Sequence, residues 1–103
     1  MSRGGYVNKD DLLDKEFNKI VGEVLKAKRE RKGYSLQELS NKMRNKVSRQ
    51  TLSKYENNTS NIRNGIFISI CEALGEYPPD IFEEISLKYM RYVDNHKEDL
   101  MKK

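Results

Sequence analysis

The chain contains two short helical patterns separated by only a few polar residues, and this pair constrains the fold more than any other feature. The first pattern is opened by Ser35-Leu36-Gln37-Glu38. In this capping box, Ser35 accepts a hydrogen bond from the amide of Glu38, and the Glu38 side chain accepts one from the amide of Ser35. The second pattern follows Ser48, whose hydroxyl can accept from the amide three residues further on. Two short helices joined by a tight polar turn predict a helix-turn-helix unit.

The second of these helices, residues 48–57, carries more polar side chains than packing alone requires. Leu52 and Tyr55 lie three residues apart and form a narrow apolar stripe that is expected to point inward. The side chains left on the outer face are Arg49, Gln50, Ser53 and Lys54. Because Arg can fork onto O6 and N7 of guanine and Gln onto N6 and N7 of adenine, this face has the chemistry of a base reader in the major groove. An ordinary solvated helix face is the alternative.

Basic residues are densest around this helix. The whole chain has a net charge of only +4, but the stretch from Asn41 to Tyr55 contains no acid. Its bases are Lys42, Arg44, Lys46, Arg49 and Lys54. Such a cluster indicates contact with a phosphate backbone. A solvated surface and a membrane-surface helix are the alternatives, although the segment lacks the broad apolar face that membrane binding requires.

The rest of the chain also predicts helices, so the expected fold class is all-α. Apolar residues recur at spacings of three and four between Asp10 and Gly33, with acids at the start and bases at the end, as the helix dipole favours. A strongly apolar helix is expected to end at Gly75, and the break at Pro78 can open a last one. The expected organisation is a flexible arm over residues 1–9, a helix-turn-helix domain over 10–85 and a helical extension over 86–103.

The last helix is longer than a five-helix core needs and carries a coiled-coil-like seam. We expect a homodimer contact there, and its residues are Ile85, Tyr89, Tyr92, Val93 and His96. Phe82 begins the same spacing, and Leu87, Met90 and Leu100 widen the apolar surface. The alternative is that the helix folds back onto its own domain near the first helix.

Composition argues against several other classes. No apolar run is long enough to span a membrane and no leader opens the chain, so a cytoplasmic protein without a membrane partner is expected. With one Cys and one His there is no ligand set for a metal site, and no cofactor or small-molecule ligand is expected. Cys71 is expected to be a small buried hydrophobe. No catalytic residue is predicted, because no Ser, Cys or His has a partner at catalytic spacing.

Two segments resemble a known family: residues 25–40, LKAKRERKGYSLQELS, and residues 47–57, VSRQTLSKYEN. They are similar to the Cro and lambda-repressor-like helix-turn-helix proteins, the Xre family, and the similarity extends over roughly residues 18–85. The resemblance implies a five-helix DNA-binding domain. It also implies a transcriptional repressor that binds an inverted repeat of double-stranded DNA as a dimer. The rival reading is an antitoxin or adaptor whose helical domain or tail binds and masks a partner protein.

The resemblance also assigns roles to individual residues. It makes Arg49, Gln50, Ser53 and Lys54 the base-facing positions, and it implies an ion pair between Arg29 and Glu56 that joins the first and third helices. With the basic cluster, the expected phosphate contacts are Lys42, Arg44, Lys46, Ser48, Asn57, Asn58 and Arg63. Compared with the family pattern, the turn is about two residues longer, Leu36 replaces a glutamine, Ser40 an alanine and Asn58 a glycine.

Overall fold

The computed structural model describes residues 9–98 of the 103-residue chain and contains five α-helices within that range. In chain order they are α1 (Lys9–Lys32), α2 (Leu36–Lys42), α3 (Arg49–Glu56), α4 (Asn64–Ala73) and α5 (Pro78–Asn95). The all-α, five-helix prediction is therefore confirmed. Lys9 already belongs to α1, so its assignment to the arm is wrong; residues 1–8 and Leu100 lie outside the described residues.

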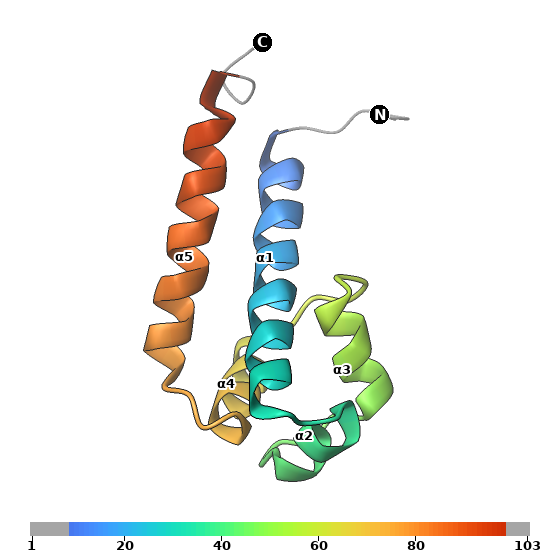
Figure 1. The fold of residues 1–103 in the computed structure, drawn as a ribbon. Coiled ribbons are helices and arrows are strands. Elements are labelled where there is room, and N and C mark those ends of the chain that lie inside the picture. The colour runs from blue at the N-terminus through green and yellow to red at the C-terminus, as the bar shows by residue number, and fades with distance from the viewer. Residues whose placement is uncertain (1–8, 99–103) are drawn as a thin grey trace, which may run out of the picture.

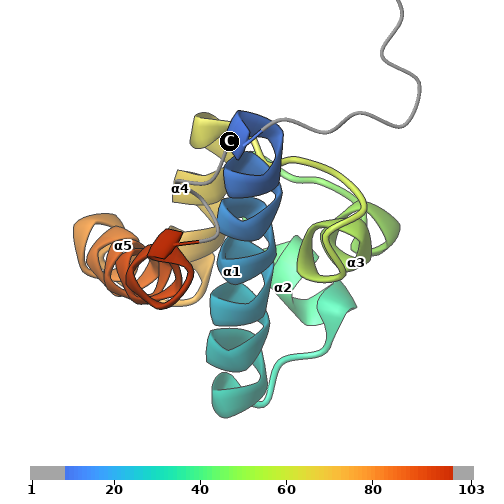
Figure 2. The same ribbon diagram turned by 90° about the horizontal axis from the view of Figure 1, so that it is seen from above.

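The long helix α1 lies between the other elements. In Figure 1, α1 and α5 run side by side in opposite directions, and α2, α3 and α4 gather around the C-terminal half of α1. Figure 2 shows α5 on one side of α1 and α3 on the other. The helix expected to read DNA and the helix with the long apolar stripe are therefore held on opposite sides of the same central helix.

The predicted helix boundaries rest on short-range contacts that the structure contains. The Ser35 hydroxyl accepts from the amide of Glu38 at 3.0 Å, and the Glu38 carboxylate accepts from the amide of Ser35 at 2.7 Å, which completes the capping box. Ser48 accepts from the amide of Thr51 at 3.1 Å and opens α3. Gly33 has a φ of 75°, a left-handed conformation that lets the chain turn from α1 towards α2.

Each helix contributes to one hydrophobic core. Its fully buried side chains are Leu25, Leu39, Leu52, Ile70, Cys71, Leu74, Ile81 and Ile85. Cys71 is the small buried hydrophobe that the sequence predicts, and its burial raises the pKa of the thiol to about 12. At neutral pH this thiol is protonated and enclosed, so it is not a nucleophile.

Part of the predicted dimer seam is wrong, because α5 folds back onto α1. Ile85 is 0% exposed and belongs to the core, and Tyr89 packs edge-on against Phe17 of α1 with ring centroids 5.3 Å apart. Periodicity identified an apolar face on α5 but not the surface that covers it. Of the remaining seam residues, Tyr92 and Val93 are half-buried. His96 is exposed and stacks on Tyr92 at 4.2 Å.

A second apolar surface of α5 stays exposed. Phe82, Leu87 and Met90 are 53%, 54% and 51% exposed.

α5 is unbroken through residues 85 and 86, where the sequence suggested a domain boundary.

Candidate nucleic-acid interface

Helix α3 separates its side chains into two faces. Leu52 is buried and Tyr55 half-buried, so the stripe three residues apart does face the core. Arg49, Gln50 and Lys54 are exposed on the other face. Among the side chains of residues 13–98, which are the ones described, these three form no hydrogen bond or salt bridge with another residue. Their donors are therefore available to an external acceptor.

Ser53 lies on the same face but is half-buried, and its hydroxyl accepts from the side-chain nitrogen Nδ2 of Asn57 at 3.2 Å. Asn57 caps the end of α3. Asn58, which replaces a glycine of the family pattern, has a φ of 61°, a left-handed conformation that Asn tolerates better than most residues. The chain can therefore leave α3 in a sharp turn without a glycine.

An ion pair fastens the end of α3 to α1. Arg29 donates from Nε to Oε2 of Glu56 at 2.7 Å and from Nη2 to Oε1 at 3.0 Å, a bidentate geometry. Its Nη1 donates to the backbone oxygen of Tyr34 at 2.7 Å, which adds the turn before α2 to the same junction. The hydrogen bond to Glu56 raises the pKa of Arg29. One guanidinium thus fixes α1, α2 and α3 relative to one another.

The extended turn between α2 and α3 is held by two buried serines. Ser40 donates from Oγ to the backbone oxygen of Val47 at 2.6 Å. Ser69 of α4 accepts from the amide of Asn45 at 3.0 Å. From the sequence, Ser40 stood out only as a replacement of the family's alanine, and no role was predicted for Ser69. The available signal was a hydroxyl within the otherwise apolar run of α4, because a buried polar group needs a partner.

The basic side chains expected on phosphates differ in how they are held. Lys42 is exposed and places Nζ 5.0 Å from the ring centre of Tyr34, and Lys46 donates from Nζ to the backbone oxygen of Asn41 at 3.1 Å. Arg44 is 83% exposed and lies 3.5 Å from the carboxylate of Glu72, an exposed pair that contributes little to stability. All three can turn towards a phosphate without breaking a buried contact.

Two further candidates flank α3. The side chain of Ser48 is occupied within the chain, because it caps α3 and donates to the hydroxyl of Thr51 at 3.0 Å. Arg63 is exposed at the N-cap of α4, where it makes no capping hydrogen bond. The basic residues thus come from the end of α2, the turn, α3 and the start of α4.

A glycine that sequence reasoning missed lies at the contact between α1 and α3. Gly22 is buried in the middle of α1, beside the backbone oxygens of Tyr55 and Glu56. A glycine inside a helix costs about 1 kcal/mol relative to alanine, so its position in an apolar helical stretch was itself a signal of close packing.

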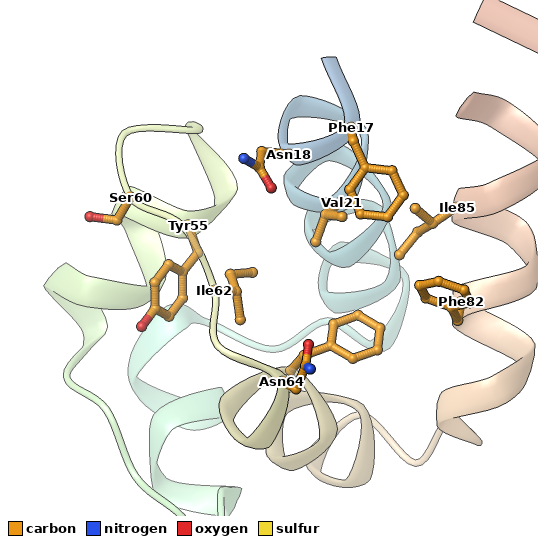
Figure 3. Close-up of a pocket in the computed structure, with 10 residues that line it drawn as sticks. Phe17, Asn18, Val21, Tyr55, Ser60, Ile62, Asn64, Phe82 and Ile85 are labelled. Atoms are coloured by element: carbon orange, nitrogen blue, oxygen red, sulfur yellow. The ribbon is translucent and has the colours of Figure 1, made fainter. Parts of the chain in front are cut away.

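The structure also contains a small cavity beside the end of α3, lined by both apolar and polar side chains. Figure 3 shows it between three elements: α1, α5 and the loop that precedes α4. Phe17, Val21, Ile62 and Phe82 are among its lining residues. Its volume is about 80 Å³, far below the roughly 300 Å³ at which small-molecule sites begin. Among the described side chains, those of residues 13–98, no three of His, Cys, Asp or Glu are grouped to hold a metal ion. No helix in the described part of the chain is long and apolar enough to cross a membrane.

A short capped α2, a turn fixed by buried serines and a polar-faced α3 fastened to a long α1 define a helix-turn-helix DNA-binding domain. A sequence profile described as helix-turn-helix matches residues 25–82. The chain therefore belongs to the helix-turn-helix family of the Xre and lambda-repressor type, as the sequence resemblance predicted.

Two solved structures are similar to this chain. Both are crystal structures of the clp gene regulator ClgR from Corynebacterium glutamicum. One is 28% identical with a TM-score of 0.66 and covers 82% of this chain and 85% of its own. The other is 29% identical with a TM-score of 0.62 and covers 70% and 91%. A comparison with curated proteins gives no match.

Proposed function

We propose that the protein is a sequence-specific transcriptional repressor that binds an inverted repeat as a dimer and inserts α3 into the major groove. The observation that carries this proposal is the outer face of α3, where Arg49, Gln50 and Lys54 are exposed. The Arg29–Glu56 ion pair holds the end of α3, and Ser40 holds the turn that leads into it. A reader of base edges needs exposed donors on a fixed backbone. The similarity to ClgR, which is named as a gene regulator, supports the same role, and regulation of transcription implies a cytoplasmic protein.

In this proposal, phosphate contacts and base contacts make different contributions to binding. The cations near α3 supply affinity by displacing counterions, so each phosphate contact steepens the fall of log affinity with log salt by about 0.9. Arg49, Gln50 and Lys54 supply sequence preference, because a good bidentate base contact discriminates by about 1 to 3 kcal/mol.

Selection from a random duplex library, at a salt concentration of about 0.15 M, tests the proposal directly. An enriched inverted repeat with half-site centres about one helical turn apart is the expected result. Enrichment of a single half-site would support DNA reading by α3 and contradict the dimer. If nothing is enriched by a folded protein, the DNA-reading proposal is wrong and the partner-binding alternative takes its place.

Substitutions then separate the two kinds of contact. Arg49→Ala or Gln50→Ala is expected to relax preference at one or two operator positions. Lys42→Ala, the matched control at an exposed cation outside α3, is expected to weaken all sequences equally and to lower the salt slope by about 0.9. Unchanged preference in both α3 variants would contradict the assignment of α3 as the reading helix.

We propose that the exposed face of α5 forms the dimer contact, and that Ile85 and Tyr89 do not. Leu87 and Met90 are half exposed there, and exposed Glu83 and Arg91 lie four residues on either side of Leu87. Two antiparallel copies of α5 centred on Leu87 would bring Glu83 opposite Arg91 of the partner subunit. This charge complementarity favours a second copy over an unrelated protein.

Sedimentation equilibrium measures this contact. Leu87→Lys is expected to shift the protein to monomer, whereas Ile68→Lys, at an exposed apolar residue of α4, is expected to leave the dimer unchanged. The same apolar face of α5 is what favours the second candidate function, an antitoxin or adaptor that masks a partner protein. A monomeric wild-type protein with an enriched single half-site would reject the dimer but not the DNA-reading role.

A further inference from the structure

Gly22 lies where α1 and α3 come closest. A Cβ atom added at this position would lie 2.5 Å from the backbone oxygen of Tyr55 and 3.0 Å from that of Glu56. Both oxygens belong to the last turn of α3, so no side-chain rotation can move them away. Gly65 near the start of α4 offers the opposite case, since an added Cβ there meets nothing within 4 Å.

The same turn of α3 is held by a second contact on the same side of α1. Glu56 supplies both the backbone oxygen beside Gly22 and the carboxylate that binds Arg29. Gly22 and Arg29 are seven residues apart, two turns of a helix, and therefore lie on one face of α1. The end of α3 thus rests on α1 through one close backbone approach and one ion pair.

We propose that Gly22 is a positioning residue for the recognition helix: the missing side chain sets how closely, and at what tilt, α3 lies on α1. The inference rests on the proposed DNA-reading function of α3. To restore ordinary contact at 3.4 Å, an alanine at this position would push the last turn of α3 outward by about 0.9 Å. The turn before α3 is held by Ser40 and Ser69, so this displacement of the last turn tilts the helix.

A tilt of this size affects base contacts more than phosphate contacts. Hydrogen bonds to base edges tolerate only a narrow range of donor–acceptor distances, about 2.7 to 3.2 Å. The lysine and arginine side chains that neutralise phosphates are long, so they can change rotamer and stay close to a phosphate when the helix tilts. We therefore expect Gly22 to govern sequence discrimination while leaving non-specific affinity intact.

The test compares Gly22→Ala with Gly65→Ala and the wild type. Affinity is measured for the duplex selected by the wild type and for a scrambled duplex, over a range of salt concentrations. Gly22→Ala is expected to lower the ratio of the two affinities about five-fold or more, the loss of one base contact, with the salt slope unchanged. Gly65→Ala is expected to match the wild type. An unchanged ratio in folded Gly22→Ala would overturn the inference.

An NMR comparison tests the geometry without DNA. In Gly22→Ala, the amide signals of residues 54–59 are expected to shift, and those of α4 are expected to stay in place. Signals that shift throughout the core, or nowhere near α3, would overturn the inference. If the wild type enriches no duplex, the proposed function fails, and the NMR comparison still decides whether Gly22 positions α3.

If Gly22→Ala does not fold, the substitution is made together with Gly65→Ala. The second change favours folding because alanine is a better helix former than glycine. Gly65→Ala alone is then the reference. A double variant that still does not fold would reject the inference, because Gly22 would then be required for the core and not for the placement of α3.

Discussion

Removing Glu56 leaves an almost enclosed guanidinium without its carboxylate, and this change gives the sharpest test of how α3 is held. The side chains of Arg29 and Glu56 are only 12% and 7% exposed. Glu56→Ala deletes both bonds of the bidentate pair, at 2.7 and 3.0 Å, and keeps only the bond from Arg29 to the oxygen of Tyr34. Breaking a buried ion pair by removing one partner costs about 3 to 5 kcal/mol.

The residual exposure and the surviving bond to Tyr34 lower the expected cost to about 2 to 4 kcal/mol of unfolding free energy. For a domain of this size, each kcal/mol lowers Tm by about 4 to 8 °C, so a fall of at least about 8 °C is expected. Urea unfolding followed by far-UV circular dichroism measures the free energy, and a thermal melt measures Tm.

A double-mutant cycle with Arg29→Met separates the pair from its surroundings. Removing both charges is expected to cost clearly less than the sum of the single changes, because neither charge is then left enclosed alone. Arg44→Ala serves as the control, since it removes an exposed pair and is expected to change stability by less than about 0.5 kcal/mol. A cost below about 1 kcal/mol for Glu56→Ala, or additive single changes, would refute the reasoning.

Three other predictions concern single residues. Ser69→Ala removes the acceptor for the amide of Asn45 and is expected to cost about 1 to 3 kcal/mol in urea unfolding; a smaller cost would mean that water replaces the hydroxyl. The folded protein keeps the Cys71 proton up to a pKa of about 12, whereas an unperturbed thiol releases it near 9.0, so stability is expected to fall above pH 9.0. The free energy of unfolding is expected to fall by at most about 1.4 kcal/mol per pH unit because of this group. In Cys71→Ala this fall should be absent, which urea titrations at several pH values measure. Gly33→Ala forces a side chain into φ 75° and is expected to destabilise by about 1 kcal/mol, whereas Gly65→Ala should not; equal melting curves would contradict this.

The sequence by itself determined the helices and the outer face of α3. The capping box at Ser35, the cap at Ser48 and the stop at Gly33 act over three or four residues, so they can be identified without knowledge of the fold. The division of α3 into an apolar and a polar face follows from helical spacing alone. The pairing of Arg29 with Glu56 was implied by resemblance to a family, since no local pattern connects residues so far apart in the chain.

Only the tertiary structure decided what each apolar face packs against. Helical spacing marks Ile85 and Tyr89 as a stripe, but it does not distinguish a partner chain from α1, and in the folded chain α1 covers them. The contact between Gly22 and the end of α3, and the bond from Asn45 to Ser69, likewise join segments distant in sequence. Such contacts depend on how whole helices dock, and docking is set by the combined shape of the core rather than by any one segment.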